Sequence, residues 1–148
     1  MRVALILVSF AFLFSGCQKT VNKTTDSGVQ TSSATVREAS PVETQAAVSK
    51  PYSQFIDVRT PEEYSGGHAA RAVNIPLDTL MASLDRLEKN EPVYLICQTG
   101  RRSGQAAEML KGAGFSNVFN VAGGTTAWQS ANLPMETKPP HTVPSPAK

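Results

Sequence analysis

The chain has 148 residues, which is room for one globular domain but not for a second catalytic domain of ordinary size. Charged residues make up 18% of the chain, and the formal net charge is +2. This balance lacks the excess of lysine and arginine that marks nucleic-acid-binding proteins, so we expect no nucleic-acid partner.

Residues 1–16 have the pattern of an export signal. Arg2 precedes an apolar run from Val3 to Phe14, and two small residues and Cys17 follow that run. The run is about 12 residues long, whereas a helix that spans a bilayer needs roughly 20. The pattern therefore favours a cleaved signal peptide over a retained transmembrane helix.

The tetrapeptide from Phe14 to Cys17 resembles the end of a bacterial lipoprotein signal, although Phe14 stands where leucine is usual. The resemblance implies acylation of Cys17 and an exported protein, anchored by lipid to the cell envelope on its periplasmic side. Gln18 is not the aspartate that commonly retains such proteins at the inner membrane, which favours the outer membrane. The alternative is an ordinary secretory peptide in which the cysteine falls at this position by chance.

Two polar segments flank the region that we expect to fold. Residues 17–34 are rich in Thr, Ser, Asn and Gln and bury too little apolar surface to fold, so we interpret them as a flexible, lipid-anchored tether. Such a tether spans about 20–25 Å. Residues 136–148 are rich in proline, which predicts a disordered tail. The folded domain is therefore expected at residues 35–135.

Within that domain, apolar runs alternate with helical patterns. Ser40, Pro41 and Glu43 form a capping box that predicts a helix to about Val48. The other predicted helices begin at Thr60, cover 77–87 and run from Ser103 to about Ala113, and strands are predicted at 55–58, 72–75, 93–96 and 118–121. This alternation predicts an α/β fold with a parallel sheet and helices on both faces.

Cys97 follows the apolar run 93–96, which suits a central strand that is covered on both faces. In open parallel sheets, sites form beyond the carboxyl ends of the strands. If Cys17 carries lipid, Cys97 is the only thiol left and has no partner for a disulfide. It is therefore either a buried, inert thiol or a reactive one.

The residues after Cys97 favour the reactive alternative. They are Gln98, Thr99, Gly100, Arg101 and Arg102, with Ser103 expected to begin the next helix. A glycine in mid-loop allows successive amides to turn inward as an anion-binding nest. Two cations and a helix start add positive potential, so we predict that the pKa of Cys97 lies below its ordinary value.

The run Cys-x-x-Gly-x-Arg-Ser resembles the active loop of rhodaneses, which has six residues, here 97–102. A thiolate cradled by amides can attack a sulfane sulfur or a phosphoryl group. Cysteine phosphatases carry their arginine six positions after the cysteine, where this chain has Ser103. The tighter loop favours sulfur over phosphate, and phosphatase or arsenate-reductase chemistry stays a less favoured alternative.

Two further segments resemble the same family. The run from Asp57 to Tyr64, with Gly67, His68 and 72–76, resembles its first signature, and Gly114 to Trp128 resembles its closing segment. Arg71 stands where the family usually has glycine. Together these segments cover about 35–135. The resemblance implies a rhodanese-like α/β fold with a central parallel five-stranded sheet and helices on both faces.

The resemblance also implies a thiosulfate sulfurtransferase in which Cys97 is the catalytic residue and carries sulfur as a persulfide. Thiosulfate or a similar small donor would supply the sulfur, and a thiol, cyanide or a protein would accept it. The substrate-binding residues would be Gln98, Thr99, Gly100, Arg101, Arg102 and Ser103, with Arg102 on the sulfonate of the donor and Arg101 setting the potential at the mouth. A non-enzymatic sulfur carrier or binding module at the membrane remains the alternative.

The other polar residues of the signatures have simpler interpretations. We expect Asp57 and Arg59 to form structural ion pairs at the end of their strand, and His68 to cap or pack. Neither His68 nor His141 has a second ligand nearby in sequence, so we expect no metal site and no cofactor. We predict that Trp128 lies in the core.

Overall fold

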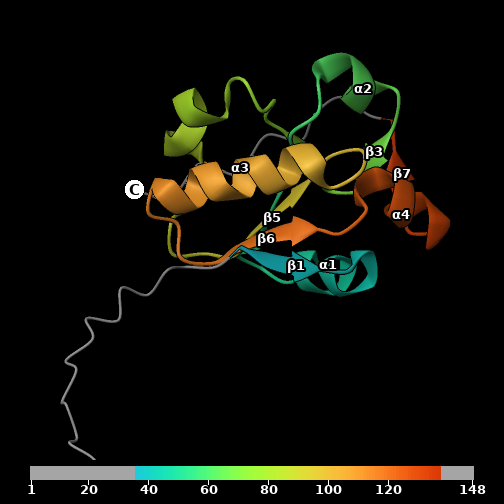
Figure 1. Ribbon diagram of the computed structural model, residues 1–148. Coiled ribbons are helices and arrows are strands. Elements are labelled where there is room, and N and C mark those ends of the chain that lie inside the picture. The colour runs from blue at the N-terminus through green and yellow to red at the C-terminus, as the bar shows by residue number, and fades with distance from the viewer. Residues whose placement is uncertain (1–35, 138–148) are drawn as a thin grey trace, which may run out of the picture. The chain divides into compact units, whose positions relative to one another are not determined.

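The computed structural model describes residues 36–137, which form a central sheet flanked by helices (Figure 1). The five strands of this sheet are all parallel and lie in the order β1-β6-β5-β2-β4. An antiparallel pair, β3 and β7, forms a second small sheet. The strands are β1 (Arg37–Ala39), β2 (Gln54–Asp57), β3 (His68–Ala69), β4 (Val73–Asn74), β5 (Val93–Ile96), β6 (Val118–Val121) and β7 (Met135–Glu136). The helices are α1 (Pro41–Val48), α2 (Pro61–Ser65), the 3-10 helix η1 (Leu80–Arg86), α3 (Arg101–Gly112) and α4 (Gly124–Ser130).

Two hydrophobic clusters cover the two faces of the sheet. One cluster packs Ala106 and Leu110 of α3 and Leu80 of η1 against the strands, and Figure 1 shows α3 crossing the sheet. The other cluster packs Val48 of α1 and Trp128 of α4 against the opposite face. Each of the buried leucines and the buried valine contributes roughly 1.5–3 kcal/mol of transfer free energy. The predicted α/β architecture, with helices on both faces of a five-stranded parallel sheet, is confirmed.

Strand β5 is the middle strand of the sheet and carries the cysteine at its end. All four of its residues are buried, as the uninterrupted apolar run predicted. Its neighbour β2 is in register with it, so that Asp57 lies opposite Ile96, and the Val58 amide donates to the Ile96 carbonyl at 2.9 Å. Val58 and Cys97 therefore lie side by side beyond the carboxyl ends of the two strands.

Both short helices that begin with proline have complete capping boxes. The Ser40 hydroxyl accepts from the Glu43 amide, and the Glu43 carboxylate accepts from the Ser40 amide at 2.9 Å. Thr60 and Glu63 repeat this reciprocal pair at the start of α2. Each cap satisfies amides that have no partner within the helix, and removing one costs about 1 kcal/mol.

The segment 77–87, predicted to be an amphipathic α-helix, is instead a 3-10 helix over Leu80–Arg86. Ser83 leaves helical geometry, with φ −115° and ψ 16°, and kinks the segment. Its hydroxyl donates to the carbonyl of Thr79 at 3.0 Å. Side-chain hydroxyls that bond to nearby carbonyls offer the backbone an alternative to regular α-helical bonding. The prediction was wrong in helix type and length, although Leu80 and Leu87 are buried as the pattern indicated.

Several elements are too short to be predicted from the sequence pattern. Strands β1, β3 and β7 have two or three residues each, and α4 has seven. Strand β7 includes Glu136, so order extends into the segment predicted as a tail. The predicted signal peptide, Cys17 and its tether, and residues 138–148 lie outside the described residues. Among residues 36–137, no helix is long and apolar enough to cross a membrane.

Arg71 provides a test of backbone strain. It is exposed and has a φ of 71°, in the left-handed region where an L residue with a side chain loses about 1 kcal/mol. Arg71→Gly should therefore raise the free energy of unfolding by about 0.5 kcal/mol, because the greater freedom of glycine in the unfolded chain offsets part of the gain. Urea unfolding measures the difference. Gln105→Gly, at an exposed position inside α3, should destabilise by about 1 kcal/mol and serves as the control.

Candidate active site

The loop after β5 places the sulfur of Cys97 among hydrogen-bond donors. The Gly100 amide donates to Sγ at 3.2 Å, and the Ser103 hydroxyl lies 3.3 Å from Sγ. The same hydroxyl lies 3.2 Å from the Gly100 carbonyl, so its single proton has two acceptors, of which an ionised sulfur is the stronger. Gly100 caps α3 with a φ of 93°, a conformation that glycine adopts without strain.

Cys97 is buried, with 1% of its surface exposed. Burial alone raises the pKa of the thiol, because a thiolate loses its hydration. Hydrogen bonds from the Ser103 hydroxyl and from the amides of Ser103, Thr99 and Gly100 outweigh burial, so that the pKa of Cys97 is lowered from its ordinary value. The direction is the one predicted from the sequence. The largest causes of the lowering are the donors of the loop and of the first turn of α3, and Arg102 also interacts electrostatically with Cys97.

Helix α4 holds the cysteine loop from the other side. The Thr125 amide donates to the Cys97 carbonyl at 2.7 Å, and the Thr126 amide and hydroxyl donate to the Gln98 carbonyl at 3.1 and 3.0 Å. Gly124 makes this approach possible, because a Cβ at that position would overlap the Cys97 carbonyl oxygen. These contacts fix the loop carbonyls outward, which leaves the loop amides free to face the sulfur.

The two arginines lie in the first turn of α3, since the helix begins at Arg101 and not at Ser103 as predicted. Arg101 is exposed. Arg102 donates two hydrogen bonds to Glu63, at 2.7 and 2.6 Å, in a bidentate ion pair. Its hydrogen bonds lower the pKa of Glu63 from 4.5 to about 2, and the carboxylate in turn raises the pKa of Arg102. Glu63 is therefore ionised throughout the physiological range.

Asp57, Arg59 and His68 make buried contacts within the scaffold. The Arg59 side chain donates to both Asp57 oxygens, at 2.6 to 3.0 Å, and reaches the Gly67 carbonyl at 2.9 Å. His68 stacks on Tyr64 with ring centroids 3.6 Å apart, and its Nδ1 lies 3.0 Å from the Tyr64 carbonyl. Because that carbonyl can only accept, the Nδ1 of His68 carries a proton.

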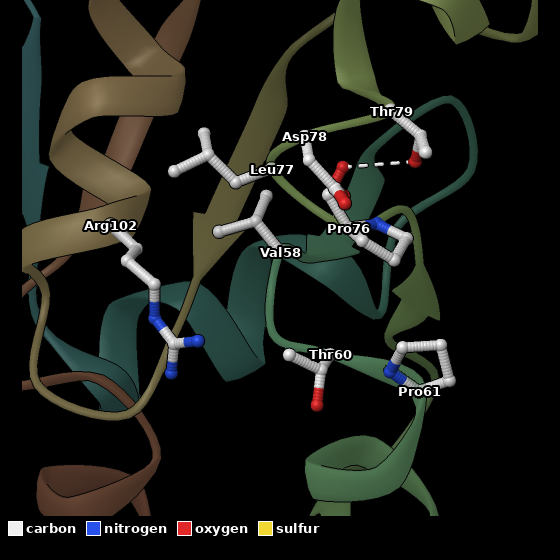
Figure 2. A pocket seen from close by; sticks show the side chains of 8 residues that line it. All are labelled: Val58, Thr60, Pro61, Pro76, Leu77, Asp78, Thr79 and Arg102. Atoms are coloured by element: carbon white, nitrogen blue, oxygen red, sulfur yellow. Dashed lines mark hydrogen bonds between the residues drawn. The ribbon is translucent and has the colours of Figure 1, made fainter.

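A pocket of about 450 Å³ opens beside the cysteine loop (Figure 2). Its lining residues come from β2 and its following turn, from the segment after β4 and from α3: Val58, Thr60, Pro61, Pro76, Leu77, Asp78, Thr79 and Arg102. Val58 follows β2, the strand paired with β5, and Arg102 is the last residue of the cysteine loop, so the pocket lies beside that loop although Cys97 is not among its lining residues. Its wall is mainly apolar, which is typical of sites for small organic molecules.

The structure brings together only part of the predicted site. Cys97, Gly100 and Ser103 meet around the sulfur, and an amide of Thr99 contributes to the same cluster. Gln98 and Arg101 are exposed, and Arg102 points to Glu63. Sequence reasoning missed Glu63 as the partner of Arg102 and missed the contacts of α4 with the loop. The glycine pair 123–124 was the available signal for the second.

Comparison with known proteins decides the family. A model of the rhodanese-like domain matches residues 40–131. The chain belongs to the rhodanese-like family. Both signature segments and the closing segment fall within the matched region, so the resemblance drawn from their residues is confirmed for the fold and the family.

Individual relatives agree with this assignment. The protein YqhL of Bacillus subtilis is 43% identical over 76 residues, which cover 51% of this chain and 60% of YqhL. The thiosulfate sulfurtransferase GlpE of Vibrio cholerae is 33% identical over 92 residues, which cover 62% of this chain and 87% of GlpE. The crystal structure of a rhodanese-related protein from Thermoplasma volcanium aligns with a TM-score of 0.62 and 28% identity, over 69% and 99% of the two chains.

Removing the Ser103 hydroxyl should test its contribution to the thiolate. In Ser103→Ala, the pKa of Cys97 should rise, and alkylation by iodoacetamide at neutral pH should slow by about tenfold or more, since one hydrogen bond to an ionised group contributes about 1.5–3 kcal/mol. The pH dependence of the alkylation rate measures this. Ser116→Ala, at a hydroxyl far along the chain that contacts Lys89, is the control. An unchanged pH profile in Ser103→Ala would contradict the assignment.

The ion pair of Glu63 and Arg102 should give a pH-dependent stability. Because folding lowers the pKa of Glu63, its contribution is present above about pH 4.5 and is lost as the pH falls toward 2. With about 30% of each side chain exposed, screening reduces the contribution to about 1 kcal/mol. Glu63→Gln should therefore be less stable than the unmodified protein at pH 7 and equally stable near pH 2 in urea unfolding. Glu108→Gln, which breaks an exposed pair with Lys111, should change stability by less than about 0.5 kcal/mol.

Proposed function

We propose that this domain is a sulfurtransferase that moves a sulfane sulfur from thiosulfate or a similar donor to a nucleophilic acceptor, through a persulfide on Cys97. The observation that supports the proposal is the convergence of the Gly100 amide and the Ser103 hydroxyl on a buried sulfur. The thiolate is the reactive form of cysteine, and these donors favour it over the thiol.

In the first half of the reaction, the Cys97 thiolate attacks the outer sulfur of thiosulfate. The bond between the two sulfur atoms of thiosulfate breaks, its electron pair leaves with sulfite, and a negatively charged persulfide remains on Cys97. The loop amides then stabilise the charge on the outer sulfur. Gln98 and Thr99 directly follow Cys97 and are exposed on the loop, so an arriving donor can contact their side chains.

The two arginines have different parts in this proposal. Arg101 has no ion pair within residues 36–137 and is exposed at the start of α3, so it can attract an anionic donor to the mouth of the site. Arg102 was expected to bind the sulfonate, but it would first have to leave Glu63. The proposal therefore assigns the sulfonate to the loop amides and to Arg101.

In the second half of the reaction, a nucleophile removes the outer sulfur and regenerates the Cys97 thiolate. Cyanide serves as such an acceptor in an assay, and a thiol or a partner protein can do so in the cell. Double displacement of this kind gives ping-pong kinetics. The alternative within the same family is a carrier that is loaded with sulfur but does not turn over.

The geometry disfavours phosphatase or arsenate-reductase chemistry. A loop that binds phosphate needs a guanidinium free to contact its oxygens. Here Arg102 is engaged by Glu63 through two hydrogen bonds, and Ser103 occupies the position where such enzymes carry arginine. The proposed sulfur transfer requires neither Arg102 nor Ser103 to change its hydrogen-bond partner.

We also propose that the protein is exported and held at the cell envelope by lipid on Cys17. The support is the sequence pattern of residues 1–17 alone. In this arrangement the polar segment 18–34 would let the domain act near the membrane surface.

Replacing Cys97 by serine should abolish sulfur transfer from thiosulfate to cyanide, because a hydroxyl neither ionises in this pH range nor forms a persulfide. Mass spectrometry after thiosulfate exposure should show one added sulfur atom on the unmodified protein and none on Cys97→Ser. Cys17→Ser is the matched control and should load normally. Loading without turnover would identify a carrier, and turnover by Cys97→Ser would overturn the proposal.

A further inference from the structure

The pocket beside the cysteine loop lies on the same side of the sheet as Cys97. Val58 forms part of its wall; it follows the last residue of β2, which is paired with the last residue of β5 before Cys97, and its amide donates to the Ile96 carbonyl. Side chains at paired positions of parallel strands lie on the same face of the sheet, and both residues belong to one hydrophobic cluster. The pocket and the sulfur of Cys97 therefore lie on the same face of the sheet, the one that carries α3, although Cys97 is not itself among the lining residues.

The wall of the pocket selects for an organic molecule. Val58, Pro61, Pro76 and Leu77 present carbon to the cavity. Its volume, about 450 Å³, is far larger than sulfite or cyanide needs and is in the usual range for small organic ligands. An acceptor with a short carbon skeleton would gain from burying that skeleton here.

The charges around the pocket disfavour an anion. Arg102 is its only lining cation among the described residues, and Glu63 already holds that guanidinium with two hydrogen bonds. Asp78 also lines the pocket, and no side chain of residues 36–137 forms an ion pair with it. Figure 2 shows Asp78 on the segment that faces Arg102 across the cavity. Counting Arg102, Glu63 and Asp78 together, the local charge is negative.

We propose that this pocket binds the sulfur acceptor, and that the acceptor is a small organic thiol that is neutral or positively charged. The inference rests on the proposed sulfurtransferase function. The acceptor attacks the outer sulfur of the Cys97 persulfide as its thiolate, the bond between the two sulfurs breaks, and Cys97 leaves as the thiolate. The proton of the acceptor thiol passes to the transferred sulfur, so that the product is the acceptor persulfide.

Three thiols of nearly equal size test the role of charge: cysteamine, 2-mercaptoethanol and 2-mercaptoethanesulfonate. Full-length protein is first loaded with thiosulfate, and the loss of the Cys97 persulfide is then followed for each thiol by mass spectrometry. We expect the second-order rate constants, at low ionic strength, to fall in the order cationic, neutral, anionic, with about tenfold between the ends of the series. Added salt should reduce the differences among the three rate constants.

Two variants separate the pocket from the intrinsic reactivity of each thiol. Asp78→Asn should lower the ratio of the cysteamine rate to the 2-mercaptoethanesulfonate rate about threefold or more. Glu63→Gln should also lower this ratio, because glutamine can still complete the cap of α2 while Arg102 regains its free charge. Asp85→Asn removes an exposed carboxylate outside the pocket and should leave the ratio unchanged.

The outcomes distinguish this inference from the function on which it rests. If thiosulfate loads no sulfur on Cys97, the proposed function fails. Suppose that loading and transfer occur but the anionic thiol reacts fastest. Or suppose that the ratio of the cysteamine rate to the 2-mercaptoethanesulfonate rate is the same in the unmodified protein, Glu63→Gln and Asp85→Asn as in Asp78→Asn. In either case the pocket does not select the acceptor and the inference is overturned. A ratio that falls in Asp78→Asn and Glu63→Gln but not in Asp85→Asn supports it.

Discussion

The site depends on the balance between burial of one sulfur atom and the donors that surround it. A thiolate that is 1% exposed loses nearly all of its hydration, which alone would keep Cys97 protonated and inert. The Gly100 amide at 3.2 Å and the Ser103 hydroxyl at 3.3 Å replace water with fixed dipoles. Because the net pKa is lowered, the donors dominate, and in the proposed reaction the buried position would keep water away from the persulfide.

Segments far apart in the sequence maintain that balance. Strand β5 places Cys97 at its carboxyl end, and the start of α3 supplies Ser103. Helix α4 binds the carbonyls of the loop through Thr125 and Thr126. If those carbonyls turned inward, they would repel the thiolate that the amides stabilise. The glycine at 124 is therefore a requirement of the chemistry as well as of packing, since any side chain there would displace the loop.

The parts of the fold that depend on local chemistry were predictable from the sequence. The run 93–96, the capping boxes at Ser40 and Thr60, and the glycine that turns the cysteine loop each act within a few residues. The ion pair between Glu63 and Arg102 was not predictable, because it joins residues 39 positions apart and both had simpler local roles. The 3-10 helix escaped prediction because Leu spacing is similar in both helix types, whereas the kink at Ser83, whose hydroxyl donates to the Thr79 carbonyl, leaves no mark in that spacing.

Glu63 has both a local role in α2 and a long-range role at the start of α3. Its carboxylate caps α2 through the Thr60 amide and also neutralises Arg102 in the first turn of α3. If Glu63 only capped α2, Arg102 would be an unpaired cation at the pocket. The pocket and the mouth of the loop would then both be positive and would both favour the anionic donor. With Arg102 paired, positive potential remains at the loop amides and Arg101, whereas the pocket next to Val58 is apolar and carries Asp78. In the proposed reaction, one side chain would thereby let an anionic donor and a non-anionic acceptor use different surfaces around the same sulfur.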